Sequence, residues 1–264
     1  SQLAYFRFRG LAPEAFTPGV PLAALLRAEN FSEMLTEVYH KELNRRFFYA
    51  LAASPRFRTL ELGGIADEWS EREEKQFAAM TVRLEDGTAY VAFRGTDTTL
   101  LGWKEDFALA FRTPVPSQTA AAEYLQRAAQ AMPGPLLVGG HSKGGNLAVY
   151  AAMMSPPETL SRIGRIYSHD GPGFPEELLQ SAGFHAVSAR IDKTLPQSSL
   201  IGMLLQSQER YRVIRSTGVG VMQHDPFSWE IVHGGFVPVE GLSVGARYMD
   251  RTLNAWIAGM APDE

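Results

Sequence analysis

Cysteine is absent from this chain of 264 residues. Its absence excludes disulfide bonds, thiolate metal sites and cysteine nucleophiles. The sequence also lacks an apolar run of about eighteen residues, so it predicts no membrane-spanning segment. The first ten residues, SQLAYFRFRG, have no apolar core of the kind found in secretory signal peptides. We therefore expect a cytoplasmic protein.

A strong excess of charge of either sign is missing as well. The chain has 25 Lys and Arg against 29 Asp and Glu, which gives a formal net charge of −4 at pH 7. A mildly acidic protein without a basic block gives no reason to expect nucleic acid or an anionic membrane as a partner. The length and the hydrophobic share of 45% predict a single domain over residues 1–264, and they leave the oligomeric state open.

The most informative stretch is residues 135–154, PLLVGGHSKGGNLAVYAAMM. An apolar run ends in two glycines, and a helix-forming segment follows them. Between the two, residues 140–144 spell G-x-S-x-G, the nucleophile elbow in which a strand turns sharply into a helix and exposes a serine. Because both the strand and the helix that this motif requires are present, Ser142 is the candidate nucleophile.

Strand and helix patterns alternate around this elbow. Residues 76–84 and 88–94 predict two strands joined by the turn Glu85-Asp86-Gly87. A helix is expected at 117–132, before the elbow, and another strand at 163–168, after it. This alternation predicts an α/β fold with a mostly parallel central sheet and helices on both faces.

The outer parts of the chain give weaker patterns. Residues 1–30 contain three prolines and predict an arm with a short helix, whereas 31–53 have the apolar spacing of one long helix. A strand is expected at 57–62. The charged stretch 67–75, DEWSEREEK, predicts a surface loop or helical turn, and residues 244–260 predict a closing amphipathic helix.

Two backbone N–H groups are candidates for an oxyanion hole. In hydrolases with an elbow, the N–H of the residue after the nucleophile supplies one donor, and Lys143 has that position here. A strand ending in Gly-Thr upstream of the elbow is a suitable place for the second, so Thr96 is expected to donate its N–H. The alternative role for Thr96 is to cap a following helix, and the two roles are compatible.

A serine hydroxyl needs a base, which is normally a histidine held by a carboxylate. After an elbow the order along the chain is serine, acid, histidine. Among the six histidines, His224 is favoured over His233 because it lies in a loop beyond a candidate strand. Asp170, at the end of the predicted strand 163–168, is favoured as the acid over Asp192. Each of these residues could instead form an ordinary structural hydrogen bond.

The pairs His169-Asp170 and His224-Asp225 could also indicate a metal site. No His-x-x-x-His or Glu-x-x-His spacing accompanies these pairs. The sequence therefore predicts neither a metal nor another cofactor.

Four motifs occur in order along the chain: FRGTDTTLLGWKEDF, GHSKGGNLA, DGPGF and QHDPFSW. Together they resemble a bacterial lipase-like α/β-hydrolase family that is catalogued as a domain of unknown function and is related to the class 3, or fungal-type, lipases. The resemblance covers residues 20–235, approximately. It implies an α/β-hydrolase fold with Ser142 as nucleophile, His224 as base, Thr96 near the oxyanion hole and a lid in the region 97–118.

The position of the acid departs from this resemblance. Class 3 lipases carry it in an Asp-Ile-Val-Pro motif, where this chain has Ser199-Leu200-Ile201-Gly202. The stretch IGRIYSHDGPG is instead similar to pancreatic-type lipases, whose acid follows the strand after the elbow, and this similarity supports Asp170. The sequence therefore predicts a serine hydrolase that cleaves small-molecule or lipid esters. The alternatives are a thioesterase, peptidase or acyltransferase with the same triad, or a non-catalytic binding protein on this fold.

Overall fold

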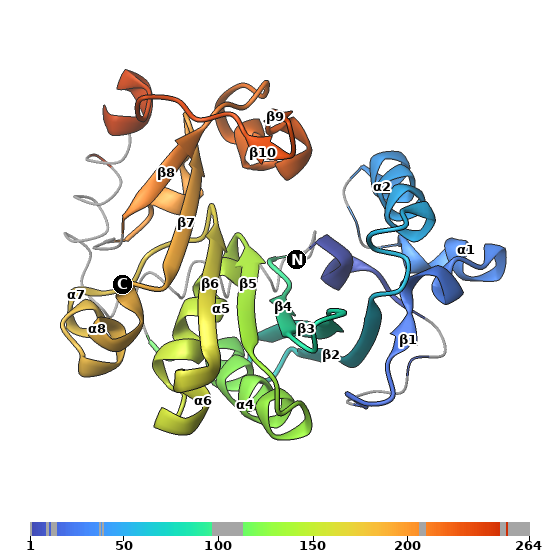
Figure 1. Cartoon of the computed structure of the whole chain (residues 1–264). Coiled ribbons are helices and arrows are strands. Elements are labelled where there is room, and N and C mark those ends of the chain that lie inside the picture. The colour runs from blue at the N-terminus through green and yellow to red at the C-terminus, as the bar shows by residue number, and fades with distance from the viewer. Residues whose placement is uncertain are drawn as a thin grey trace.

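The computed structural model describes residues 2–8, 11, 15–36, 38, 40–96, 113–205, 210–248 and 252. A sheet of eight strands, in the order β1 to β8, forms its centre (Figure 1). The strands are β1 (Val20–Pro21), β2 (Glu61–Ser70), β3 (Lys75–Arg83), β4 (Ala89–Phe93), β5 (Leu136–His141), β6 (Ile163–His169), β7 (Ile191–Pro196) and β8 (Tyr211–Ile214). A separate small sheet pairs β9 (Ile231–Val232) with β10 (Gly235–Phe236).

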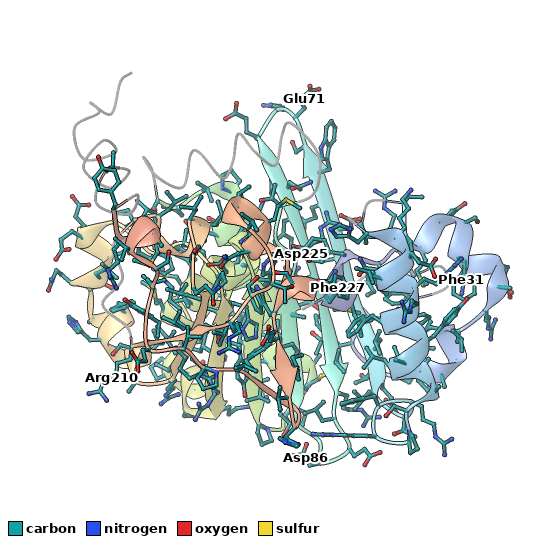
Figure 2. The ribbon with its side chains drawn as sticks, turned by 90° about the horizontal axis from the view of Figure 1, so that it is seen from above. Phe31, Glu71, Asp86, Arg210, Asp225 and Phe227 are labelled. Atoms are coloured by element: carbon teal, nitrogen blue, oxygen red, sulfur yellow. The ribbon has the colours of Figure 1, made fainter. Side chains whose placement is uncertain are left out.

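The direction of the strands changes at β4. Strands β1 to β4 are antiparallel neighbours, whereas β4 to β8 pair in parallel. Tight turns suffice between antiparallel strands, and Glu71 and Asp86 mark the two turns at opposite ends of β3 (Figure 2). Parallel strands need longer crossovers, most of which contain helices here. The structure thus confirms the predicted hairpin over 76–94 and the mostly parallel sheet.

Helices and 3-10 turns cover the sheet and line its edges. The helices are α1 (Phe31–Met34), α2 (Lys41–Ala53), α4 (Pro116–Ala131), α5 (Lys143–Met153), α6 (Pro157–Arg162), α7 (Glu176–Leu179) and α8 (Ala182–Ser188). The 3-10 turns are η1 (Gln2–Tyr5), η2 (Leu22–Leu25), η3 (Ala28–Asn30), η4 (Ile201–Met203), η5 (Gly220–His224) and η6 (Pro226–Ser228). None of the helices in these described ranges has the length and apolar character needed to cross a membrane.

Two hydrophobic clusters lie on opposite faces of the sheet, because alternate side chains of a strand point to opposite sides. On β3, Phe77 and Ala79 belong to the cluster that packs against α4 and α5. Met80 and Val82 belong to the cluster formed with the N-terminal segment and α2. Helical segments on both faces of a sheet whose fifth strand leads into a sharp turn and a helix make this the α/β-hydrolase fold.

Several local predictions were wrong. The helix expected at 31–53 is broken, since α1 ends at Met34 and α2 begins at Lys41, after His40 takes a positive φ of 52°. The strand expected at 57–62 begins at Glu61 instead. It continues to Ser70, through charged residues that were expected to form a surface loop. Charge is tolerated there because, among the described strands, β1 pairs only with the start of β2, and the second half of β2 lies at an edge of the sheet.

Other predictions lie partly outside the described residues. The arm expected at 1–30 contains η1, β1, η2 and η3, so it forms short 3-10 turns and one edge strand. Most of the lid region, residues 97–112, is not described, and Pro116–Gln118 at its end form the first turn of α4. Most of the helix expected at 244–260 is likewise outside the described residues.

The elbow depends on close contact between β4 and α5 at Gly144. A Cβ at this position would lie 2.3 Å from the carbonyl oxygen of Phe93. Because this oxygen belongs to the backbone, the clash could be relieved only by a shift of β4 or α5. We expect Gly144→Ala to lower the free energy of unfolding by about 3 kcal/mol or more, as measured by urea denaturation. Gly164→Ala is the matched control, because its Cβ would lie 3.8 Å from the nearest atom. Equal stability of the two variants would contradict this account of the elbow.

Candidate active site

Ser142 lies at the sharp turn between β5 and α5. Its φ of 59° and ψ of −133° are rare for a residue with a side chain, and such strain is typical of a nucleophile elbow. Its N–H donates to the carbonyl oxygen of His169 at 2.9 Å, and its own carbonyl oxygen accepts the N–H of Gly145 at 2.9 Å. These bonds connect the turn to β6 and to the first turn of α5.

His224 lies at the end of η5 and contacts Asp170, which follows β6. The Nδ1 atom of His224 is 2.7 Å from Oδ2 of Asp170, and the aspartate is fully buried. Because a carboxylate can only accept, Nδ1 carries the proton. The neutral ring therefore has its basic lone pair on Nε2, the nitrogen that a general base uses.

The second carboxylate oxygen of Asp170 is also held. Oδ1 accepts hydrogen bonds from the hydroxyl of Ser199 and from the N–H of Gly202, the latter at 3.2 Å. The sequence analysis did not find this contact, although Ser199 stands where class 3 lipases have their acid. With three donors on its two oxygens, Asp170 has a fixed orientation toward His224.

His141 connects His224 to the elbow. The two imidazole rings pack together in a tilted arrangement, with their centroids 4.4 Å apart and their planes inclined by 35°. The Nε2 of His141 donates to the backbone carbonyl oxygen of His224 at 2.8 Å. Since His141 directly precedes Ser142, His224 lies close to the candidate nucleophile. The sequence analysis assigned His141 no role, and its place beside the serine was the only available signal.

The hydroxyl of Ser142 and the imidazole of His224 are separate in this structure. Both Ser142 and His224 belong to the described part of the chain, and no hydrogen bond joins the serine hydroxyl to the imidazole there. Bonds of this kind are often long in an empty site and shorten when substrate binds.

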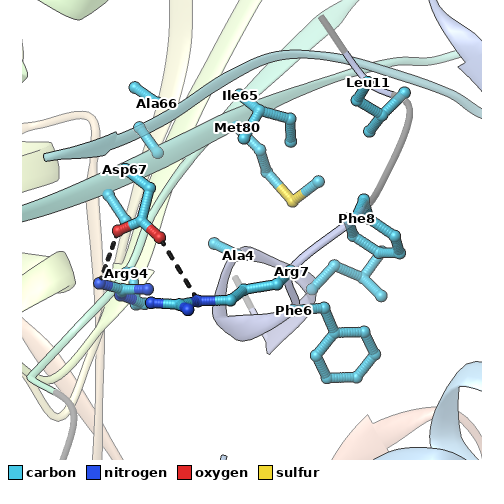
Figure 3. Close-up of a pocket in the computed structure, with 13 residues that line it drawn as sticks. Ala4, Phe6, Arg7, Phe8, Leu11, Ile65, Ala66, Asp67, Met80 and Arg94 are labelled. Carbon is cyan, nitrogen blue, oxygen red and sulfur yellow. Dashed lines mark hydrogen bonds and ion pairs between the residues drawn. The ribbon is translucent and has the colours of Figure 1, made fainter. Parts of the chain in front are cut away.

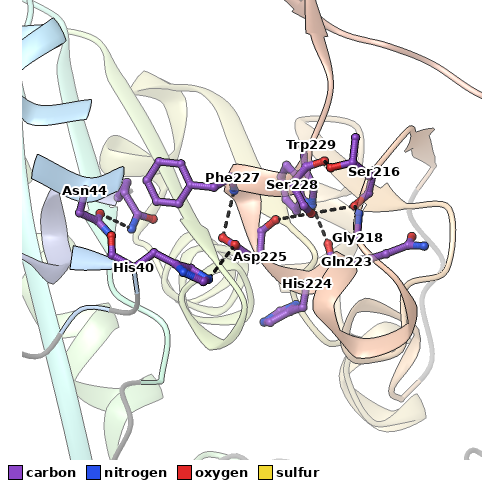
Figure 4. Close-up of polar contacts among 12 residues, drawn as sticks. His40, Asn44, Ser216, Gly218, Gln223, His224, Asp225, Phe227, Ser228 and Trp229 are labelled. Carbon is purple, nitrogen blue, oxygen red and sulfur yellow. Dashed lines mark hydrogen bonds and ion pairs between the residues drawn. The ribbon is translucent and has the colours of Figure 1, made fainter. Parts of the chain in front are cut away.

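The loop that carries His224 is attached at several points (Figure 4). The indole N–H of Trp229 donates to the carbonyl oxygen of Gln223 at 2.8 Å. Asp225 accepts the N–H of Phe227 at 3.0 Å, and its other oxygen lies 3.2 Å from Nε2 of His40. The motif QHDPFSW thus fixes its own loop and ties it to the residue before α2.

The two candidate oxyanion donors belong to the segments that follow Ser142 and β4. Lys143 begins α5, and Thr96 follows Gly95 at the end of β4. A Cβ on Gly95 would be 3.0 Å from the Cβ of Ser142 and 2.5 Å from Oη of Tyr5. The N–H of Gly95 also donates to this tyrosine oxygen at 3.1 Å. Tyr5, which no sequence motif indicated, is therefore a neighbour of the nucleophile.

The two alternative site residues lie elsewhere. Asp192 pairs with Arg165 at 3.1 Å and with Arg212 at 2.7 Å. His233 lies in the exposed turn between β9 and β10. Within the described ranges, no group of three or more His, Asp or Glu side chains has an arrangement that could hold a metal ion.

Two histidines beside the site have lowered pKa values. Burial, together with the neighbouring His224, lowers the pKa of His141 well below its ordinary value. Burial also lowers the pKa of His169 to about 4. The ring of His169 packs against Trp229 and Phe236, and its Nδ1 has no hydrogen-bond partner among the described residues. Both rings are therefore neutral near pH 7.

This neutrality predicts a loss of stability in acid. Well above pH 6.5, His169 is neutral in both the folded and the unfolded state, so it has no effect on the pH dependence there. Between pH 6.5 and about 4, the unfolded state takes up a proton that the folded state does not. The free energy of unfolding should therefore be about 2 kcal/mol lower at pH 5 than at pH 7 from this residue alone.

The measurement is urea unfolding at the two pH values for the wild type and for His169→Phe. The phenylalanine keeps an aromatic ring against Trp229 and Phe236 but cannot titrate. Between pH 7 and pH 5, the free energy of unfolding should decrease in both proteins. The decrease in His169→Phe should be smaller than that in the wild type by about 2 kcal/mol. An identical fall in the two proteins would show that His169 is not the group responsible.

Comparison with solved structures found several proteins that are similar to this chain and are described as lipases. The Rhizomucor miehei lipase in a propeptide complex is 17% identical over 67% of this chain and 70% of its own, with a TM-score of 0.44. M37 lipase is 14% identical over 85% and 77%, with a TM-score of 0.48. A triacylglycerol lipase from Penicillium expansum is 14% identical over 76% and 79%, with a TM-score of 0.40.

Comparison of sequences gave two results. Among curated proteins, none matches this chain. The model of the Mbeg1-like family matches residues 51–264, which include the elbow, Asp170 and His224. This match extends over most of the sequence, and the chain belongs to the Mbeg1-like family.

Proposed function

We propose that this protein is a serine hydrolase that cleaves carboxylic esters. Ser142 is the nucleophile, His224 the general base and acid, and Asp170 the carboxylate that orients the imidazole. The proposal rests above all on one contact, the 2.7 Å hydrogen bond between Nδ1 of His224 and the buried Asp170. This contact leaves Nε2 of a neutral imidazole as the base, on the loop that His141 ties to the elbow.

In the first step, Nε2 of His224 takes the proton of the Ser142 hydroxyl as Oγ attacks the ester carbonyl carbon. The carbonyl π electrons move to oxygen, and the N–H groups of Thr96 and Lys143 stabilise the resulting oxyanion. When the tetrahedral intermediate collapses, the alkoxide leaves with the proton from His224. The products of this step are a free alcohol and an acyl group on Ser142.

In the second step, His224 removes a proton from water, which attacks the acyl carbon. Collapse of the second intermediate releases the carboxylic acid and returns the proton to Oγ of Ser142. Asp170 stabilises the imidazolium that forms in each half-reaction and keeps the ring in one tautomer. Its two further hydrogen bonds, from Ser199 and Gly202, hold the carboxylate in the required orientation.

The test is a panel of p-nitrophenyl esters, the matching thioesters and the matching anilides at pH 7.5. Ester hydrolysis with a faster first turnover than later ones supports an acyl-enzyme esterase. A clear preference for the thioester or the anilide would change the reaction class while keeping the triad. Turnover of none of them by folded protein would favour the alternative of a non-catalytic binding protein.

A further inference from the structure

A pocket of about 230 Å³ lies beneath the N-terminal segment (Figure 3). Its walls are mainly apolar, with Leu3, Ala4 and Phe6 on one side and Ile65, Ala78 and Met80 from β2 and β3 on the other. The mechanism proposed above assigns no role to this pocket. Its apolar lining favours an apolar occupant, because burial of apolar surface drives binding.

The strands leave this space open for two reasons. The pairing of β2 with β3 is irregular between Gly63 and Ala66, and a bulge of this kind bends the strand. On β3, the small side chain of Ala78 is buried but belongs to neither of the two clusters that cover the sheet. The space above Ala78 is therefore not filled by the core.

Two separate segments connect this pocket to the nucleophile. In the N-terminal turn η1, Ala4 lines the pocket and the next residue, Tyr5, binds the N–H of Gly95. At the end of β4, Arg94 lines the pocket and the next residue is Gly95 itself, which abuts Ser142. On the first segment, the neighbour of a pocket-lining residue binds Gly95, and on the second segment that neighbour is Gly95.

The polar end of the pocket is already paired. Arg94, with 5% of its side chain exposed, lies 3.1 Å from one oxygen of Asp67, and Arg7 lies 3.9 Å from the other (Figure 3). The two guanidinium groups at this end disfavour a cationic ligand. The methylene stems of the arginines can pack against an uncharged alkyl chain.

The volume of the pocket sets a scale for the length of the chain that it can bury. Since a water molecule takes up about 30 Å³ in the liquid, 230 Å³ holds roughly eight atoms of that size. We infer that the pocket receives the acyl chain of the ester substrate, with an optimum near eight carbons. This inference rests on the proposed function. Because the family match begins at residue 51, the N-terminal segment that forms one wall lies outside it.

The test uses ethyl alkylphosphonofluoridates with alkyl chains from methyl to dodecyl. In these probes, the serine oxygen bonds to phosphorus as fluoride leaves, and the alkyl group takes the place of the acyl chain. The rate constant for modification of Ser142 should rise by up to about fourfold per methylene, and then level off near eight carbons. The variants are Ala78→Leu, which fills the pocket, and Leu3→Ala, which enlarges it.

Ala78→Leu should lower the octyl-to-methyl ratio of rate constants by about 50-fold, because its side chain displaces roughly three methylenes. Leu3→Ala should move the plateau to longer chains. Ala53→Leu adds the same side chain on the exposed end of α2 and should keep the wild-type ratio. One shared chain-length profile for all four proteins, with Ser142 modified, would overturn the pocket inference alone. Failure of every probe to modify Ser142 would instead overturn the proposed function.

Discussion

Replacing His224 with alanine is expected to lower kcat for ester hydrolysis by about a millionfold. The imidazole has two tasks, since it removes the proton from Ser142 and then delivers it to the leaving alcohol. No neighbouring histidine can take them over. The closest, His141, uses its Nε2 to bind the carbonyl oxygen of His224, and burial keeps its pKa low.

The measurement is kcat for wild type, His224→Ala, Ser142→Ala and the double variant. Because base and nucleophile act as a unit, the double variant should lose no more activity than either single variant. His233→Ala is the control, since this histidine lies in an exposed turn and should retain wild-type kcat. If His224→Ala kept activity within tenfold of wild type, the base would be another group.

Replacing Asp170 with asparagine should lower kcat by about ten thousandfold. An asparagine can keep its oxygen on Ser199 and Gly202 and present its NH₂ group to Nδ1 of His224. The NH₂ group is a donor, so Nδ1 must accept and the proton moves to Nε2. The imidazole is then in the tautomer that cannot remove the proton from Ser142.

Asp192→Asn distinguishes this mechanism from a general effect of losing a carboxylate. Asp192 pairs with Arg165 and Arg212, so its loss should change kcat by less than about threefold. The melting temperature of Asp170→Asn should be recorded alongside, because the residue is fully buried. A large loss of kcat in Asp192→Asn with little effect in Asp170→Asn would assign the acid to the other residue.

The central elements of the fold were predictable because their signals are local. The strand before Ser142 and the helix after it follow from an apolar run, two glycines and a helix-forming segment. The hairpin over 76–94 follows from the turn at 85–87. Asp170 could be selected because an acidic residue at the carboxyl end of a parallel strand lies at the edge where α/β folds build sites.

Contacts between distant segments could not be predicted in this way. Periodicity predicted one helix at 31–53, but it carries no information about the contact of His40 with Asp225, which lies in the loop beside α2. The hydrogen bonds from Ser199 to Asp170 and from Gly95 to Tyr5 also join residues that are far apart in the sequence. The pocket wall formed by η1 depends on how the N-terminal segment packs, which tertiary contacts decide.

The most direct test of the central claim is the intact mass of the protein after treatment with a fluorophosphonate probe. A serine hydroxyl reacts with such a probe when a nearby base activates it. We predict one adduct on the wild type and none on Ser142→Ala. Folded wild-type protein that gains no adduct, even with detergent present, or a Ser142→Ala variant that is still labelled, would contradict the account.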